Sequence, residues 1–356
     1  MQRAILAVAA LLAAVPALAQ DNFPPAPPIA DPKPFRLPAT ETYVLPNGLQ
    51  VTLIPYGIAP KTVVSLRVRA GAVNEGEAVW LSEATGALMK EGAAGKTAAD
   101  LAATAAGMGG QLNVSAGMQS TSVGVNVLSE YAPAAVALVS DVAIRPTLPA
   151  SELARVKANL GRQLSITLSQ PGPLADVALG RTIYGANHPY GRLIPGAAQL
   201  QGYTIAQVKA FHAGQFGAKR AHLYVAGRFD TAAVKAAIDK AFAGWAAGPD
   251  PVVLDSPHKP GPQVVLIDRP GAPQATLRLA FDASRAGTDA DIPQRVTNAL
   301  LGGAFSSRII RNIREDKGYT YSPYSDVDFT PEQALWGFQA DVTTEHTGDS
   351  LHEVFK

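Results

Sequence analysis

Residues 77–92, EAVWLSEATGALMKEG, are the stretch around which the rest of the chain is organised. They follow a turn of small and polar residues, AGAVNEG, and their apolar spacing predicts a helix. Trp80, Ala84 and Leu88 stand four residues apart, so they share one helix face, which we expect to be packed. Glu83 lies off that face and is expected to point to solvent or a cleft. The stretch contains no histidine.

Composition limits the classes of function. The chain has 356 residues, enough for two domains of ordinary size. It is 47% hydrophobic and 17% charged, which indicates a globular protein. Its 30 basic and 29 acidic residues give a net charge of +1, so no basic excess favours nucleic acid or anionic lipid. The lack of cysteine is compatible with an oxidising compartment.

The N-terminus has the pattern of a secretory leader. Arg3 supplies a positive charge, residues 4–18 are apolar, and Ala17 and Ala19 flank Leu18 as in a cleavage site. An apolar run of about 15 residues is short for a membrane span, which needs about 20. We therefore expect a signal peptide, residues 1–19, cut after Ala19, and a periplasmic or secreted protein without stable membrane insertion; the alternative is an uncleaved anchor. Residues 20–39 predict a proline-rich linker.

Alternating strand and helix patterns then fill residues 40–245. The expected strands are 41–44, 49–55, 63–70, 111–116, 121–127 and 221–225, with the first two flanking an Asn47-Gly48 hairpin turn. The expected helices, besides 77–92, are 97–106, 130–144, 151–170, 174–184, 205–216 and 231–245. Pro171 is expected to end the longest of them.

A second linker, residues 246–262, contains five prolines, and the strand, strand, helix order starts again after it. Strands are expected at 263–267, 275–281, 320–326 and 334–342, and helices at 292–301 and 305–317. Two copies of one α+β domain, residues 40–245 and 263–356, follow from this repeat. The second copy is much the shorter, and we expect it to be partial, because the sequence ends inside what reads as a further helix.

Metal and nucleophile patterns are missing from the sequence. A helical zinc site needs histidines at i and i+4, whereas no two of the six histidines are three to five residues apart. There is no cysteine and no Gly-x-Ser-x-Gly motif. The histidines are therefore interpreted as surface or loop residues, and no catalytic residue is assigned.

One polar constellation remains, in residues 305–321, FSSRIIRNIREDKGYTY. Arg314 is expected in the last turn of a helix, and Tyr321 on the strand after Gly318, so the two side chains could converge. A guanidinium and a phenol together suit a peptide carbonyl or carboxylate. The alternative is structural: Arg314 pairs with Glu315 or Asp316, and Tyr321 is half-buried.

Several motifs resemble those of the M16 metallopeptidases, the insulinase, pitrilysin and mitochondrial processing peptidase group, in its short bacterial form. They are LPNGLQVTLIP, GAVNEG, YGANHPYGRLIPG and, most specifically, LGGAFSSRIIRNIREDKGYTYSPYS. The resemblance implies α+β tandem LuxS/MPP-like domains, each an antiparallel sheet packed with helices. Active members hold zinc with His-x-x-Glu-His and a later glutamate; the matching positions are Glu83, Gly86, Ala87 and Gln163, so the motif is degenerate.

The resemblance also implies a role for the second domain. Active members hold substrate near the zinc with an Arg and a Tyr, which match Arg314 and Tyr321. In two-subunit members one chain carries the zinc motif and its partner carries this pair. We therefore expect a non-catalytic, substrate-positioning subunit of a periplasmic heterodimer that binds no cofactor itself, with zinc in the partner subunit and a peptide as substrate. The alternatives are a silent scaffold or peptide-binding homologue, and a stand-alone zinc metalloendopeptidase.

Overall fold

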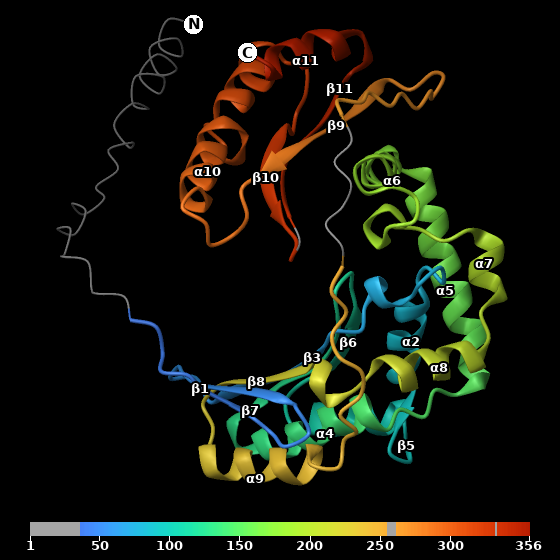
Figure 1. Ribbon diagram of the computed structural model, residues 1–356, viewed down its shortest axis with the longest axis vertical. Coiled ribbons are helices and arrows are strands. Elements are labelled where there is room, and N and C mark those ends of the chain that lie inside the picture. Colours follow the sequence, from blue (N-terminus) through green and yellow to red (C-terminus); the bar gives the residue numbers. More distant parts are fainter. Residues whose placement is uncertain (1–35, 255–260, 332) are drawn as a thin grey trace, which may run out of the picture. The chain divides into compact units, whose positions relative to one another are not determined.

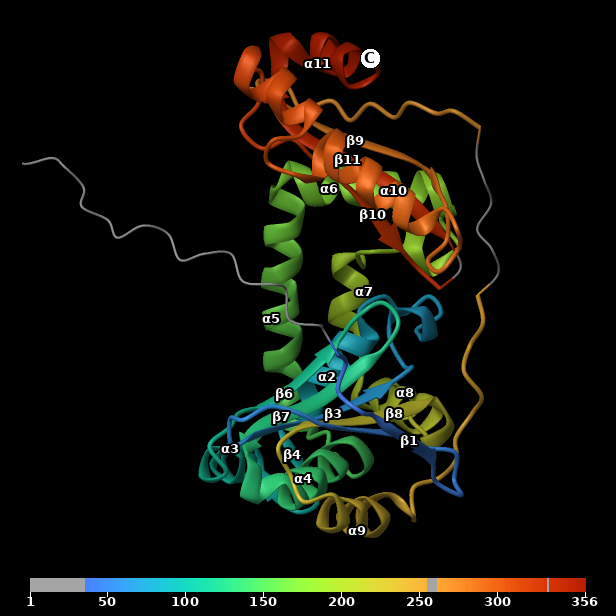
Figure 2. The same ribbon diagram turned by 90° about the vertical axis from the view of Figure 1, so that its left-hand side faces the viewer.

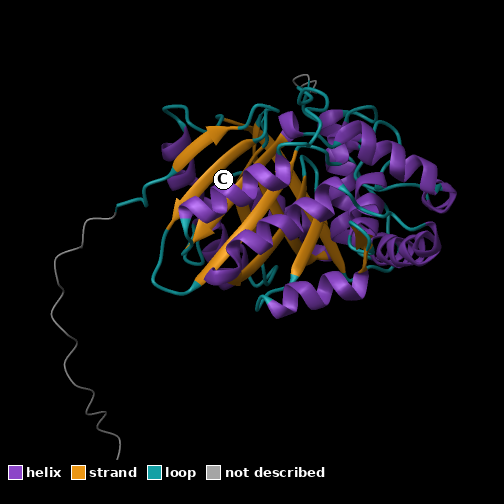
Figure 3. Cartoon of the chain, turned by 90° about the horizontal axis from the view of Figure 1, so that it is seen from below, coloured by secondary structure: helices purple, strands orange, loops and turns teal. Residues whose placement is uncertain are grey.

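The computed structural model describes residues 36–254, 261–331 and 333–356, and Pro38–Lys356 form one compact unit. The expected signal peptide, residues 1–19, and most of the first linker lie outside the described residues. Helices and strands alternate along the chain in an α+β arrangement, as Figure 3 shows by colour. Within the described ranges, no helix has both the length and the apolar composition that a membrane span requires.

A six-stranded sheet forms the centre of the first half (Figure 1). Its order is β1-β2-β8-β3-β7-β6, and all neighbours are antiparallel except β2 and β8, which run parallel. The strands are β1 (Glu41–Val44), β2 (Gln50–Pro55), β3 (Lys61–Val68), β6 (Leu112–Ala116), β7 (Thr121–Leu128) and β8 (Ala221–Gly227). The expected hairpin between β1 and β2 is confirmed, with Gly48 at φ 94 in the turn.

Alternation along these strands directs one side chain in two to the core. In β3, Val64, Leu66 and Val68 are fully buried. Helices α4 (Ala132–Ile144) and α9 (Thr231–Phe242) lie together beneath the sheet in Figures 1 and 2, and α4 contacts β3 and β7. The core of this half is therefore the layer between the sheet and these helices.

Six further α-helices belong to the first half, and two of them begin at capping signals in the sequence. They are α2 (Leu81–Met89), α3 (Ala98–Gly107), α5 (Ala150–Ser169), α6 (Pro171–Tyr184), α7 (Ala197–Gly202) and α8 (Ile205–Gln215). Thr97 and Thr204 both close capping boxes, with Asp100 and Gln207 respectively. The short strands β4 (Gly92–Ala93) and β5 (Lys96–Thr97) join α2 to α3.

The second half contains a three-stranded antiparallel sheet in the order β10-β11-β9. Its elements are β9 (Gln274–Ala283), α10 (Asp291–Asn298), the π-helices η5 (Ala299–Gly303) and η6 (Ile310–Asp316), β10 (Tyr324–Phe329), β11 (Ala334–Thr343) and α11 (Thr347–Val354). Ile309 and Ile313 pack with Phe338, Ala340 and Val342 in a small separate core.

Four sequence expectations need correction. The helix expected over residues 77–92 begins only at Leu81, because Trp80 has a left-handed backbone. The helix expected over residues 305–317 starts at Arg308 and is π-helical from Ile310. Tyr321 lies in a loop rather than on a strand. Residues 263–267 are extended but have no hydrogen-bonded strand beside them among the described residues.

Candidate functional site

The start of α2 is held by a buried carboxylate. Glu75 is 8% exposed, and its oxygens accept the backbone N–H of Trp80 at 3.0 Å and of Ser82 at 2.5 Å. These are donors that a helix N-terminus leaves free, so Glu75 acts as a distant cap. The left-handed Trp80, at φ 69, makes this possible, and its indole N–H donates to the Leu193 carbonyl at 3.0 Å.

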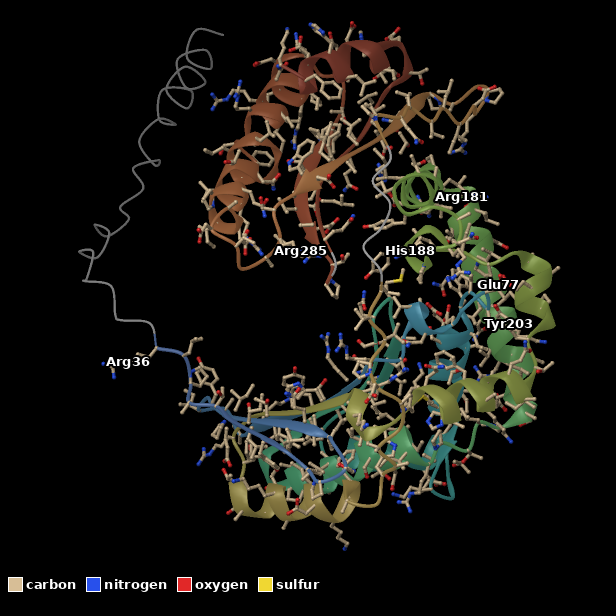
Figure 4. The ribbon with its side chains drawn as sticks, in the orientation of Figure 1. Arg36, Glu77, Arg181, His188, Tyr203 and Arg285 are labelled. Atoms are coloured by element: carbon tan, nitrogen blue, oxygen red, sulfur yellow. The ribbon has the colours of Figure 1, made fainter. Side chains whose placement is uncertain are left out.

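A second carboxylate lies beside the first. Ser82 Oγ donates to Glu83 Oε2 at 3.0 Å, and Glu83 is half-buried rather than open to solvent. Burial, together with the nearby charge of Glu83, raises the pKa of Glu75 to about 8. Tyr203 donates its hydroxyl to the Val79 carbonyl at 2.7 Å, and its pKa is raised by burial and by both carboxylates. Figure 4 labels Tyr203 and Glu77 close together at this corner.

The four positions that the family resemblance matches to zinc ligands and the catalytic glutamate do not form a metal site. Glu83 accepts the Ser82 hydroxyl. Gly86 is buried, with its Cα hydrogen facing Ala116 and Val114 of β6. Ala87 packs against the core, and Gln163 is exposed on α5. Within the described part of the chain, no three His, Cys, Asp or Glu side chains gather as metal ligands. These residues do not fit a zinc ion.

Several of the described histidines take part in local packing. His212 lies in α8 and bonds to the Ala143 carbonyl at 2.9 Å, so the expectation that it is a surface or loop residue is wrong. Burial lowers its pKa. His222 lies in β8 between the hydroxyls of Thr52, at 2.8 Å, and Tyr224, at 2.9 Å. His258 falls outside the described residues.

The YGANHPYGRLIPG segment builds a compact loop next to α2. The rings of Tyr184, His188 and Tyr190 cluster at 5.0–5.4 Å between centroids, and Figure 4 shows His188 in the loop after α6. Tyr190 O–H also meets the side chain of Gln119. Gly191 is required, because a Cβ there would lie 2.0 Å from the Gly185 carbonyl oxygen. This motif therefore supports the loop that receives the Trp80 indole.

The second half brings Arg314 and Tyr321 together, as the sequence spacing suggested. The Arg314 guanidinium carbon lies 4.6 Å from the centre of the Tyr321 ring and 4.8 Å from the centre of the Phe305 ring. Its Nε is 3.0 Å from Glu315 Oε1, so part of the structural alternative also holds. Tyr321, however, is 77% exposed rather than half-buried, and Phe305 is 72% exposed.

Close packing fixes the backbone that carries Phe305. A Cβ at Gly302 would lie 2.3 Å from Ser325 Oγ of β10, so only glycine allows η5 to approach that strand. Asn298 Nδ2 donates to the Ser325 carbonyl at 3.0 Å, and Asn298 Oδ1 accepts the Trp336 indole N–H at 2.8 Å. Ser307, just after Phe305, is 2% exposed. Both sides of Phe305 are thus anchored.

Sequence reasoning missed two residues of these sites. Phe305 lies in the most specific motif, but nothing local shows that its ring reaches a guanidinium nine residues later. Glu75 lies in the GAVNEG turn, and its role depends on the left-handed Trp80, which sequence does not reveal. A lone acidic residue in a turn before an uncapped helix was the available signal.

Comparisons with known proteins find matches to one peptidase family along most of the chain. Residues 56–188 match the family model described as insulinase (peptidase family M16), and residues 202–356 match the model described as peptidase M16 inactive domain. An uncharacterized zinc protease of Mycobacterium tuberculosis is 27% identical over 332 residues, which cover 90% of this chain and 74% of the relative. The uncharacterized zinc protease YmxG of Bacillus subtilis is 25% identical over 285 residues, 80% of this chain and 69% of the relative.

Solved structures have the same fold. The crystal structure of a peptidase M16 inactive domain from Pseudomonas fluorescens superposes with a TM-score of 0.82 at 26% identity, covering 89% of this chain and 78% of that chain. A protease from Helicobacter pylori gives a TM-score of 0.78 at 18% identity, covering 90% of this chain and 79% of that chain, and shows the fold alone.

Proposed function

Since this chain belongs to the M16 peptidase family, we propose that it is a subunit without a metal centre, which positions a peptide at a zinc site carried by a partner subunit. One contrast supports this proposal. The positions that match the zinc motif hold Glu83, Gly86 and Ala87, and Gly86 faces β6 across a packed contact. Arg314 and Tyr321, in contrast, lie in contact, and the Tyr321 side chain is exposed.

The chemistry of the pair fits a substrate-positioning role. Arg314 Nε lies 3.0 Å from Glu315 Oε1, and among the described residues no acceptor is bonded to the Nη atoms of Arg314. These N–H groups are donors suited to a peptide carbonyl or carboxylate. The Tyr321 hydroxyl would donate to a carbonyl oxygen on which negative charge develops, where a fixed donor has most effect.

The test is peptide cleavage by the complex of this chain with a zinc-motif-bearing subunit, of the kind that a neighbouring gene would encode. Arg314→Ala should lower kcat/KM by about 100-fold, the size of effect seen when one fixed donor is removed. Arg311→Ala is the matched control, because Arg311 is an exposed arginine of the same π-helix, and it should leave the rate unchanged. Full activity of the partner alone would overturn the proposal.

Metal content gives a second test of the same proposal. The purified chain, analysed alone by plasma mass spectrometry after dialysis, should contain far less than one zinc per molecule. A stoichiometric zinc ion would instead favour the stand-alone peptidase. A chain that associates with no zinc-bearing subunit and still binds peptides would be a scaffold or peptide-binding homologue.

The location that we propose is the periplasm or the exterior of the cell. The leader pattern of residues 1–19 supports it. Sequencing the N-terminus of the protein recovered from a periplasmic extract should give Gln20 as the first residue. Recovery of the uncut chain from the cytosol would contradict this location.

A further inference from the structure

The aromatic residue Phe305 has no role in the function proposed above, yet it contacts the same guanidinium as Tyr321. The two rings approach Arg314 to nearly the same distance, 4.8 Å and 4.6 Å, and the Arg314 side chain is only 23% exposed. A guanidinium held against aromatic rings keeps its plane and loses part of its hydration. Arg314 is therefore oriented before a ligand arrives.

The two rings also remain largely open. Phe305 is 72% exposed and Tyr321 is 77% exposed, although aromatic side chains of this size usually bury most of their surface. Their positions are fixed from both directions in the chain: η5 packs on β10 through Gly302, and Thr320 bridges to Val342 of β11. An anchored exposed ring beside a cation offers an apolar contact to whatever the cation binds.

The charge around the cluster favours an anion. Residues 305–321 contain four basic side chains, Arg308, Arg311, Arg314 and Lys317, and two acidic ones, Glu315 and Asp316. Lys317 lies 3.6 Å from Glu353, and Arg314 Nε lies 3.0 Å from Glu315, so a ligand would meet the Nη atoms of Arg314. A free carboxylate would gain more from the Arg314 charge than an uncharged carbonyl would.

From these observations we infer that Phe305, Arg314 and Tyr321 form a subsite for the C-terminal carboxylate of a peptide that ends in a large apolar residue. The Arg314 Nη donors bind the carboxylate, and the two rings contact the terminal side chain. Phe305 is then a specificity-determining residue. The inference rests on the proposed function, because it assigns the class of peptide that the Arg314 and Tyr321 pair receives.

Binding to the full chain tests this subsite without a partner subunit. The probes are three pentapeptides labelled with fluorescein at the N-terminus: Ala-Ala-Ala-Ala-Phe with a free carboxylate, the same peptide as its C-terminal amide, and Ala-Ala-Ala-Ala-Ser with a free carboxylate. Fluorescence anisotropy should give the lowest Kd for the first. Amidation should weaken binding about tenfold, because a charge-assisted pair is lost.

Variants of Phe305 distinguish the loss of its ring from a loss of folding. Phe305→Leu should raise the Kd of the Phe-ending peptide about fivefold and that of the Ser-ending peptide by clearly less, and Phe305→Tyr should restore tight binding. Because Phe305 is exposed, none of these changes should alter the melting temperature. Phe355→Leu, at a 63% exposed aromatic residue on another element, is the matched control and should bind like the wild type.

Three results would overturn the inference: no measurable binding of the Phe-ending peptide, equal affinity for its acid and amide, or a Kd that Phe305→Leu does not change. The proposed function fails separately. If Arg314→Ala slows cleavage by the complex while Phe305→Leu leaves peptide binding unchanged, the positioning role stands and the subsite is rejected. If Phe305→Leu weakens peptide binding while Arg314→Ala leaves cleavage unchanged, the subsite stands and the positioning role is rejected.

Discussion

The Glu75 carboxyl takes the place of an N-cap side chain at the start of α2. Its buried oxygens accept two backbone N–H groups of residues 80 and 82, which no adjacent Ser, Thr or Asp caps. The half-buried Glu83 stands beside it and raises its pKa. Glu83, which the family resemblance matches to a zinc-binding histidine, therefore contributes to a carboxyl pair in this chain.

This pair makes stability depend on pH. The pKa of Glu75 rises from 4.5 to about 8 on folding, so the folded chain binds the proton more tightly than the unfolded chain. The stabilisation is complete below pH 4.5 and is lost as pH rises to about 8. We expect the wild-type unfolding free energy, measured with urea, to fall over this window, whereas that of Glu75→Gln should change much less.

The exposed Glu77 provides the control for this experiment. Glu77→Gln should keep the wild-type slope of stability against pH. Glu83→Gln should reduce the slope, because it removes one cause of the raised pKa. Identical slopes for the wild type and Glu75→Gln would show that Glu75 does not take up the proton.

At the scale of elements, sequence predicted best what local chemistry decides. The helices that follow Thr97 and Thr204, and the helix end before Pro171, appear where expected. The errors concern interactions between distant residues. Residues 263–267 have strand composition, but a strand also needs a neighbour, and α2 starts late because a carboxylate five residues before Trp80 holds its first turn.

In the candidate site, too, local spacing was predictable from the sequence and packing between distant residues was not. The spacing of Arg314 and Tyr321 was enough to expect their convergence, and their rings and guanidinium do meet. Their role in substrate binding stays a prediction. Phe305 could not be expected from spacing, because its position depends on how η5 packs against β10.

That packing gives a prediction about elements. Gly302→Ala would place a Cβ 2.3 Å from Ser325 Oγ and 3.1 Å from Ile309 Cδ1, so η5 must move away from β10. We expect a loss of about 1–3 kcal/mol in unfolding free energy, the usual cost of overpacking. Chemical denaturation followed by circular dichroism measures this loss.

Gly214 offers a matched control in another helix. It lies in α8, and a Cβ there would meet nothing within 4 Å. Gly214→Ala should therefore leave stability unchanged or raise it by up to about 1 kcal/mol, because alanine loses less backbone entropy on folding. A Gly302→Ala variant as stable as Gly214→Ala would mean that η5 and β10 can separate without cost.

For the whole molecule, buried surface is divided unequally between the two halves. The larger core cluster extends from Leu45 to Trp245, whereas the second cluster has five fully packed members, Ile309, Ile313, Phe338, Ala340 and Val342. Small cores rarely stabilise a fold alone. We therefore expect the first half to fold alone and the second half not to.

Separate expression tests this difference. Residues 38–254 alone should unfold in one cooperative thermal transition, followed by circular dichroism at 222 nm in the far-ultraviolet range. Residues 261–356 alone should show no cooperative transition, because they bury few apolar side chains. A sharp transition in the second fragment, or none in the first, would contradict this division.

The extended segment at residues 263–267 has a consequence for handling the protein. Val264 is 98% exposed and Leu266 is 90% exposed, and Val265 and Ile267 are about half exposed. A short apolar run whose backbone is paired with no other strand in the described part of the chain is a template for intermolecular strand pairing. Concentrated solutions should thus aggregate through this run while each molecule remains folded, and a lysine in place of Val264 should act as a gatekeeper that raises solubility.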